Sequence, residues 1–353
     1  MARWKNTMDK AELLAARIRA YDGPPARLME VCGTHTRSIV QYGIHSVLPA
    51  QVKLISGPGC PVCVTPAGYI DRAVELSLQK DVCLCAFGDL IRVPGSGFSL
   101  MQAKAQGARV TVVYSPLEVL TLAQQEPGTL FVFAAVGFET TLPIYALMLK
   151  RMEEAKLENV RLLTAVRALM PALYWLTKGE TDVQGFLGPG HVSAILGSDV
   201  YKPFCASRRV PLTVAGFHYE QVLAGIYDLL QQIKRGTFEA RNLYPSVVSA
   251  DGNPQALSLI GECFTMNASV WRGLGTIPDS GYYIAPRFSR FDAGSFGLPE
   301  GAEKKGCLCG SVIAGKVTPR DCPHFKKSCT PATPIGPCMV SAEGACGIWA
   351  SEG

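Results

Sequence analysis

The sequence predicts an α/β protein in which two doubly wound lobes, each built on a parallel sheet, face each other. Between about residue 28 and residue 240, short runs of apolar and β-branched residues alternate with stretches of helical periodicity. Continuously apolar strands that alternate with helices are typical of parallel sheets covered on both faces. The 353 residues, 48% of them hydrophobic, suffice for two or three domains with their own cores.

The first predicted element is an amphipathic helix over residues 8–20, which ends at Asp22-Gly23-Pro24-Pro25. A strand over 28–32 follows and ends at Cys32. The later strands are expected at 52–56, 81–87, 108–114, 129–136, 160–166, 191–197 and 210–216. The later helices are expected at 67–79, 99–106, 115–126, 142–156, 220–236 and 253–265. The loop at 125–128 separates the expected lobes, 39–127 and 128–240.

Charge and hydropathy exclude several classes of protein. The net charge of +5 is spread along the chain, which argues against a dedicated nucleic-acid or membrane-surface binder. The apolar run Leu130–Phe138 is far shorter than the ~20 residues of a membrane span, and the N-terminal residues have no apolar signal-peptide core. Nucleotide-binding glycine motifs are absent. We therefore expect a cytoplasmic protein without nucleic-acid or membrane partners.

Cysteine is the residue type that points to chemistry. The chain has 13 cysteines, and six of them lie between residues 307 and 346. In a reducing compartment, clustered cysteines indicate metal binding or redox chemistry because structural disulfides do not persist there. The odd number also argues against a framework in which every cysteine is paired.

The strongest local motif is Cys60-Pro61-Val62-Cys63, directly after the strand at 52–56. Its spacing allows the two thiols to form a disulfide, and a following helix N-terminus would stabilise a thiolate. The prolines and glycines around it predict a rigid, exposed loop at the carboxyl end of a strand, where α/β sheets bind ligands. Half of a zinc knuckle, or two packed thiols, are the alternatives.

Two further motifs follow strands. Cys32-Gly33-Thr34-His35-Thr36 offers a nucleophile or soft-metal ligand in Cys32, with His35 as a base, hydrogen-bonding partner or second ligand. Glu139 follows the apolar strand at 129–136, so its carboxylate is expected at the same kind of carboxyl-end crevice.

The tail contains Cys307, Cys322, Cys329 and Cys346 with the spacing C-x14-C-x6-C-x16-C. Four thiolates suit a [4Fe–4S] cluster or a zinc ion. The long, unequal spacings favour the cluster, because zinc ribbons usually have two tight cysteine pairs. Cys309, Cys338 and His324 remain alternative ligands. For the isolated or strand cysteines, core packing is expected: Cys83, Cys85, Cys205 and Cys263.

Taken together, these motifs resemble those of the HypD family, scaffold proteins for the iron centre of [NiFe] hydrogenases. The resemblance runs from about residue 28 to residue 346 and rests on the following segments: Cys32–Thr36, Gly57–Cys63, Phe87–Asp89, Val93–Ser96, Gly137–Thr141 and the tail spacing. It implies two α/β lobes flanking a cleft and a third, mixed iron–sulfur domain. That domain would combine residues 1–38 with residues 241–353.

The resemblance also implies partners and cofactors. Members of this family work with HypC, which shares an iron ion with HypD, and with HypE, which delivers cyanide and depends on HypF upstream. The product is an Fe(CN)2CO unit, so the implied cofactors are a [4Fe–4S] cluster and, transiently, iron carrying cyanide and CO.

By resemblance, Cys32 is the iron-binding thiolate, with His35 close to the iron and Glu139 on the opposite wall of the cleft. Cys60 and Cys63 resemble the redox-active pair, with electrons reaching them from the cluster in the tail. One segment departs from the family pattern, since Gly216-Phe217-His218-Tyr219 stands where Gly-Phe-Glu-Pro is expected. This departure puts in doubt any role for a carboxylate there.

Two functions follow from these motifs. The first is a maturation scaffold that binds iron and its ligands. The second is a stand-alone thiol–disulfide oxidoreductase similar to ferredoxin–thioredoxin reductase, in which Cys60 and Cys63 turn over on a protein disulfide. Cys32 with His35 distinguishes them, because a simple reductase does not need a third thiol in such a motif.

Overall fold

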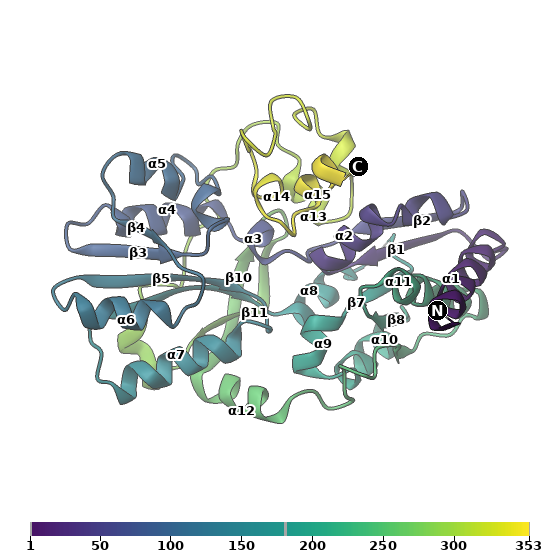
Figure 1. Cartoon of the computed structure of the whole chain (residues 1–353), viewed down its shortest axis with the longest axis horizontal. Helices are drawn as coiled ribbons and strands as arrows, with labels where there is room; N and C mark the ends of the chain where they lie inside the picture. Colours follow the sequence, from purple (N-terminus) through teal and green to yellow (C-terminus); the bar gives the residue numbers. More distant parts are fainter. Residues whose placement is uncertain (1, 180–181, 353) are drawn as a thin grey trace.

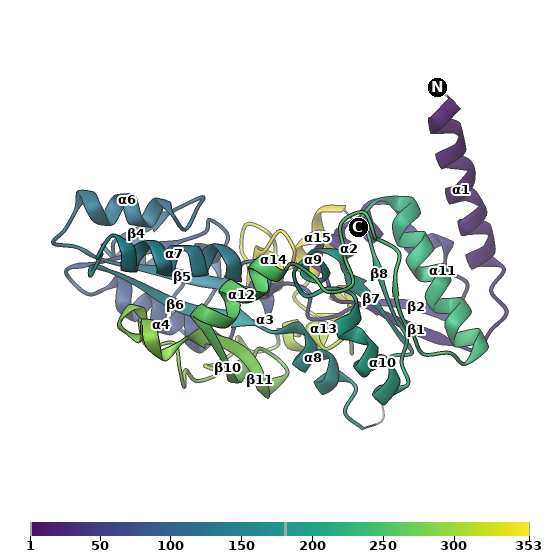
Figure 2. The same ribbon diagram turned by 90° about the horizontal axis from the view of Figure 1, so that it is seen from below.

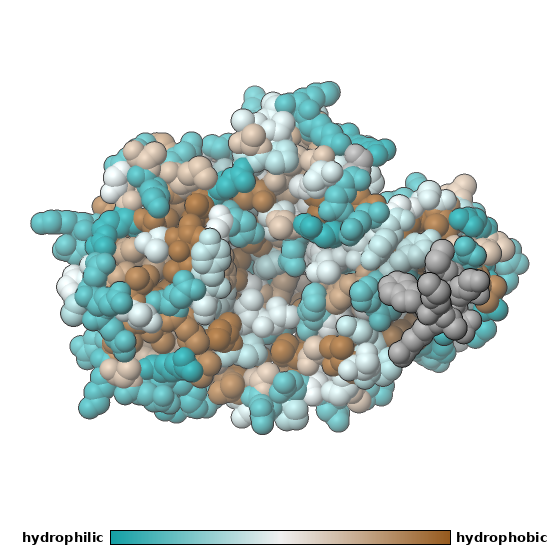
Figure 3. Space-filling view, in the orientation of Figure 1, coloured by the Kyte–Doolittle hydropathy of each residue, from teal (hydrophilic) through white to brown (hydrophobic). Residues whose placement is uncertain are grey.

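The computed structural model describes residues 2–179 and 182–352 and confirms the predicted α/β class. Two sheets lie beside each other along the long axis of the molecule, and the C-terminal segment packs over their junction (Figure 1). Hydrophilic residues line much of the rim of this face, whereas hydrophobic residues gather on the left-hand half of the view and paler residues lie in the middle (Figure 3). None of the helices in the described ranges is long and apolar enough to span a membrane.

Sheet A is entirely parallel and has the strand order β2-β1-β7-β8-β9. Its strands are β1 (Ala26–Glu30), β2 (Val52–Ser56), β7 (Gly185–Pro189), β8 (Leu212–Ala215) and β9 (Ala240–Asn242). Helix α11 (Tyr219–Arg235) packs on this sheet, and α1 (Ala2–Arg19) packs on α11 at the outer end of the molecule (Figure 2). Gly236 ends α11 in the left-handed conformation, with φ of 66°, which glycine adopts without steric cost.

Sheet B has the order β10-β11-β6-β5-β3-β4 and is mixed. Its strands are β3 (Val82–Ala86), β4 (Val110–Val112), β5 (Leu130–Gly137), β6 (Val160–Arg167), β10 (Phe264–Trp271) and β11 (Gly275–Ile284). The first four are parallel, whereas β10 and β11 form an antiparallel hairpin that pairs with β6. The helices associated with this part are α4 (Ala67–Ser77), α5 (Leu100–Ala105), α6 (Glu118–Gln125), α7 (Leu142–Glu154) and α12 (Pro254–Cys263).

The remaining helices are short. Those that follow strands or connect them are α2 (Gly33–Gln41), α3 (Pro61–Val64), α8 (Leu169–Leu176), α9 (Gly190–Leu196) and α10 (Lys202–Arg208). The cysteine-rich tail contains α13 (Cys309–Ile313), α14 (Pro337–Val340) and α15 (Ala345–Glu352). The short 3-10 helices are η1 (Ile44–Val47), η2 (Leu90–Arg92), η3 (Asp199–Tyr201), η4 (Pro286–Phe291) and η5 (Pro319–Asp321).

One expected strand is wrong. Residues 191–197 lie mostly in helix α9, and the strand at this point is β7, which ends at Pro189. A short apolar run does not distinguish a strand from a buried helix. In the helix, the Ser193 hydroxyl donates a hydrogen bond to the carbonyl of Pro189, four residues earlier, at 2.7 Å.

Strand pairing also differs from the expected division of the chain. Each sheet contains strands from both sides of residue 127, because β1 and β2 pair into sheet A with β7, while β3 and β4 share sheet B with β5. The expected lobes 39–127 and 128–240 therefore do not coincide with the sheets. Sheet B also contains the hairpin β10–β11, from the segment expected in the iron–sulfur domain, whose end residues 1 and 353 lie outside the described residues.

Candidate functional site

Two neighbouring loops begin where β1 and β2 end. These strands are parallel, with Glu30 opposite Ser56, so their following segments leave the same edge of sheet A. The loops remain joined by backbone hydrogen bonds, from the Gly57 N–H to the Glu30 carbonyl at 2.8 Å and from the Gly33 N–H to the Gly59 carbonyl at 3.3 Å. This arrangement brings the first two cysteine motifs together.

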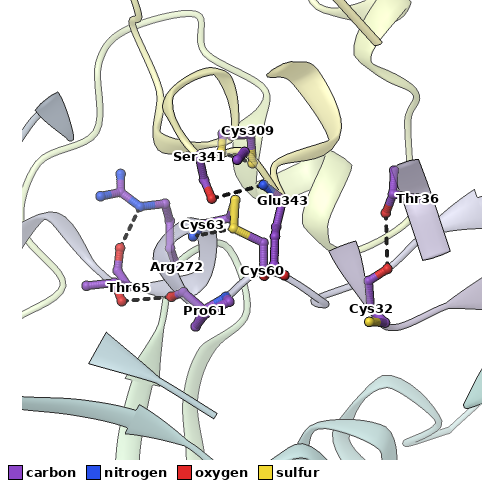
Figure 4. Close-up of a disulfide and its surroundings, with 12 residues drawn as sticks. Cys32, Thr36, Cys60, Pro61, Cys63, Thr65, Arg272, Cys309, Ser341 and Glu343 are labelled. Atoms are coloured by element: carbon purple, nitrogen blue, oxygen red, sulfur yellow. Dashed lines mark hydrogen bonds between the residues drawn. A yellow bond between two sulfur atoms is a disulfide. The ribbon is translucent and has the colours of Figure 1, made fainter. Parts of the chain in front are cut away.

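Cys60 and Cys63 form a disulfide across the single turn of α3 (Figure 4). Cys60 precedes the helix, and the backbone N–H of Cys63 donates a hydrogen bond to the Cys60 sulfur at 3.1 Å. The expected exposed loop is wrong, because only 5% of Cys60 and 2% of Cys63 are accessible to solvent. The side chains of Val62 and Val64 pack in the apolar core, and helices α13 and α14 of the tail contact the turn.

Arg272 fixes the carboxyl end of this turn from the β10–β11 connection. Its backbone N–H donates to the carbonyl of Val64 at 2.8 Å, and its Nε donates to the carbonyl of Thr65 at 2.9 Å (Figure 4). Its Nη1 also lies 3.3 Å from a carboxylate oxygen of Glu303. The disulfide is therefore held between sheet A, the hairpin of sheet B and the tail.

Cys32 lies directly before α2 and is buried, with an exposed fraction of 7%. Burial raises the pKa of its thiol to about 12, and the nearby carboxylates of Glu343 and Glu30 add to the effect. The isolated thiol is thus protonated at neutral pH. Its sulfur points away from the Cys60–Cys63 disulfide, which faces the tail (Figure 4).

Glu30 is a buried carboxylate that the sequence reasoning missed. One of its oxygens accepts the backbone N–H of Cys32 at 3.0 Å, and the other accepts the hydroxyl of Thr36 at 2.5 Å. Burial raises the pKa of Glu30 to about 7. A glutamate inside the otherwise apolar strand segment before Cys32 was the available signal, because such a charge is buried only where it is hydrogen-bonded.

His35 is fully buried beneath an aromatic stack. Its Nε2 lies 3.1 Å from the carbonyl of Gly216, which only accepts hydrogen bonds, so Nε2 carries the proton and Nδ1 the lone pair. The ring of Phe217 lies 4.8 Å from the His35 ring and 4.3 Å from that of His191. Burial lowers the pKa of His35 to about 4, so the ring is neutral. His218, in the segment that departs from the family pattern, is exposed and precedes α11.

Glu139 lies after β5, in sheet B, and is almost fully buried. One carboxylate oxygen accepts the backbone N–H of Leu169 at 2.8 Å, while the other has no hydrogen-bonding partner among the described residues. Burial raises the pKa of Glu139 to about 7. The structure does not bring Glu139 into either of the cysteine-lined cavities.

The tail encloses a small cavity lined by six cysteines. These are the four expected cluster ligands, Cys307, Cys322, Cys329 and Cys346, together with Cys309 and Cys338. The sulfurs of Cys309 and Cys338 lie 2.7 Å apart. In the described part of the chain, no three His, Cys, Asp or Glu side chains form a site for a metal ion. The chemistry of the donor set nevertheless fits a [4Fe–4S] cluster, because four of the six thiols around this apolar cavity suffice as ligands.

A second cavity joins the tail to the disulfide. Its lining includes Gly33, Cys60, Cys63, Cys338 and Glu343. Cys338 therefore lines both this cavity and the six-cysteine cavity. Glu343 is a further residue that the sequence reasoning missed; burial raises the pKa of its carboxyl. Residues that are hundreds of positions apart in the chain thus surround one small volume.

Known proteins resemble this chain over nearly its full length. The family model HypD, described as "Hydrogenase formation hypA family", matches residues 9–353. The hydrogenase maturation factor HypD of Azotobacter vinelandii is 43% identical over 357 residues, which cover 97% of this chain and 94% of that protein. The factor of the same name from Escherichia coli K12 is 42% identical over 332 residues, covering 92% and 88%. That of Rhodobacter capsulatus is 38% identical over 360 residues, covering 98% and 94%.

Proposed function

This chain belongs to the HypD family of hydrogenase formation proteins, and from that premise we propose that it is the scaffold on which the iron centre of a [NiFe] hydrogenase is assembled. Family membership gives it a role in hydrogenase formation alongside other maturation proteins. The observation that carries the more detailed proposal is the position of Cys338, which lines both the cavity beside the Cys60–Cys63 disulfide and the six-cysteine cavity.

In this proposal, Cys32 holds the iron that is being assembled, together with a cysteine of HypC. Thiolate is a soft ligand suited to low-spin iron that carries cyanide and CO. Because burial raises the pKa of Cys32 to about 12, the thiol gives up its proton only when the metal binds. The hydrogen bond from the Cys32 N–H to Glu30 fixes the loop that presents the sulfur. His35, neutral and immobilised by Gly216 and Phe217, shapes the same loop.

The Cys60–Cys63 pair serves as a two-electron store while ligands are attached to the iron. Opening the disulfide takes up two electrons and two protons and leaves two thiols. Cys307, Cys322, Cys329 and Cys346 would hold the [4Fe–4S] cluster, which supplies electrons one at a time when bound. In this proposal, HypE delivers cyanide that originates with HypF, and HypC binds on the side of Cys32.

An anaerobic infrared spectrum of the chain co-produced with HypC, HypE and HypF tests the proposal. Nitrile and carbonyl stretches that travel with this chain are the expected result. A spectrum without them, from a preparation that reduces protein disulfides catalytically, would instead establish the alternative function of a thiol–disulfide oxidoreductase.

A further inference from the structure

A cavity of about 230 Å³ lies outside the cysteine motifs, at the carboxyl end of β6. The β10–β11 hairpin and the segment around Ser295 form its other walls. Carboxyl ends of parallel strands are where open α/β sheets usually bind ligands. Phe296, which is 65% exposed, stands at its rim, so the cavity is accessible from solvent.

Arg167, the last residue of β6, supplies the only positive charge in the lining of this cavity. It is 5% exposed, and its Nη2 donates to the carbonyl of Val270 at 2.9 Å, whereas its Nε has no partner among the described residues. The ionisable groups that act on it are the phenols of Tyr69 and Tyr283 rather than a carboxylate.

Arg272 provides the contrast within the same chain. It is equally buried, at 4% exposed, but it has Glu303 as a counter-ion and donates its Nε to the carbonyl of Thr65. Buried charges in proteins are ordinarily paired, because an unpaired charge costs several kcal/mol of desolvation. Arg167 is thus buried to the same degree as Arg272, but it lacks a carboxylate partner among the described residues.

We propose that this cavity binds a small, planar monoanion of the carboxylate or bicarbonate type on the guanidinium of Arg167. Two oxygens on one carbon match the parallel N–H groups of a guanidinium. A monoanion neutralises the single charge, whereas a phosphate dianion would leave a buried negative charge uncompensated.

The two phenol hydroxyls of the lining shape the cavity without binding the anion. The hydroxyl of Tyr69 donates to the carbonyl of Leu163 at 2.8 Å, and that of Tyr283 donates to the carbonyl of Ala268 at 3.1 Å. Both protons are therefore already used. The Nε–H of Arg167 and the hydroxyl of Thr164, both without a partner among the described residues, remain as donors for a ligand.

Binding is tested on the full-length, anaerobically purified chain by calorimetric titration with acetate and with bicarbonate at constant ionic strength. Inorganic phosphate serves as the competing anion. The matched control is Arg161→Met, on the same strand, because the side chain of Arg161 donates to the carbonyls of Glu158 and Val160 rather than into the cavity. Acetate and bicarbonate should bind the wild type and Arg161→Met equally, and Arg167→Met at least about tenfold more weakly.

If Arg167→Met does not fold, Arg167→Lys tests the same prediction. It keeps the charge but loses the paired N–H groups, and we expect its Kd for acetate to rise about tenfold. The proposal is overturned if neither acetate nor bicarbonate binds the wild type, if phosphate binds as tightly as acetate, or if the Arg167 variants retain the wild-type Kd.

Discussion

The backbone of Gly59 packs against the backbone of Cys32 so closely that a Cβ atom on residue 59 would lie 2.3 Å from the Cys32 nitrogen. The loops after β1 and β2 approach each other at this point, one residue before Cys60. Only glycine allows such an approach. The distance between the proposed iron-binding loop and the disulfide therefore depends on the absence of one side chain.

Gly59→Ala is expected to separate these loops. The added methyl group meets backbone atoms that cannot rotate away, so we expect a loss of about 1–3 kcal/mol in the free energy of unfolding. Thermal unfolding measures the loss, and the infrared signals of the iron ligands should decrease in parallel. Gly128→Ala is the control, because its Cβ would meet nothing within 4 Å. Equal melting temperatures for the two variants would contradict the close packing.

Cys32→Ala should abolish binding of the iron that carries cyanide and CO and leave the absorbance of the tail cluster intact. Cys32 contributes to neither cysteine-lined cavity, so its removal leaves the six tail thiols in place. Infrared and visible spectra of the complex with HypC separate the two effects. Cys205→Ala, which removes another buried thiol, should change neither spectrum. Unchanged nitrile stretches in Cys32→Ala would remove Cys32 from the proposed role.

Cys329→Ser should bleach the visible absorbance of the cluster. Cys329 lines the six-cysteine cavity, and its sulfur accepts the backbone N–H of Ile335 at 3.3 Å, as is common for cluster thiolates. Cys83→Ser, in a strand of sheet B, should retain full colour. If Cys329→Ser keeps its absorbance, then Cys309 or Cys338 takes its place as a ligand, and the same measurement on those variants identifies which.

Alkylation should show that Cys60 and Cys63 are disulfide-bonded in the oxidised protein. After unfolding in a thiol-reactive reagent, the tryptic peptide 54–72 should carry label only if a reductant was added first. The peptide 81–92, which contains the free thiols Cys83 and Cys85, should be labelled in both cases and serves as the internal control. Labelling of 54–72 without reductant would mean that the pair rests as thiols.

The contribution of Glu139 to the stability of the protein should fall as the pH rises from about 5 to 8. Burial raises the pKa of Glu139 from 4.5 to about 7, so the folded state holds this proton at pH values where the unfolded chain has lost it. That contribution to stability is complete below pH 4.5 and disappears as the pH passes 7, a loss on the order of 3 kcal/mol. Glu30 adds a loss of the same sign.

Glu139→Gln isolates this effect. The amide oxygen can still accept the N–H of Leu169, and the side chain no longer ionises. Melting temperatures at pH 5 and pH 8 should therefore differ less in Glu139→Gln than in the wild type. Glu154→Gln, at an exposed position of α7, should behave like the wild type. A variant whose pH dependence equals that of the wild type would contradict the raised pKa.

Most of the helices and strands could be predicted from the sequence alone. Strands such as β5 and helices such as α11 were predicted within one or two residues, because a long apolar run and a long amphipathic repeat each have one stable interpretation. The hairpin β10–β11 was missed. The burial pattern of β10 is irregular, since the four consecutive residues 265–268 are all exposed, so it lacks the alternation that marks a strand.

The candidate site was predicted motif by motif, but its assembly was not. Spacing identified Cys60 and Cys63 and the cavity-lining cysteines of the tail, because thiols in these patterns have few other uses. The carboxylates Glu30 and Glu343 were both missed. The signal for Glu30 was a glutamate within an apolar strand segment, whereas nothing local shows that Glu343 lies beside Cys32. Packing of the tail against Gly33, more than 300 residues away, decides the position of Glu343, and single-sequence patterns do not contain that information.

The interleaving of the two sheets has a consequence for biosynthesis. Sheet A begins with β1 and β2 but is completed only by β7, β8 and β9. Its first two strands are therefore synthesised early and remain without these partners while four strands of sheet B leave the ribosome. The thiol at Cys32 and the pair at Cys60 and Cys63 are thus synthesised long before their surroundings exist, and the tail that covers them emerges last. Newly made chains therefore pass through a stage in which these sulfurs are open to oxidants.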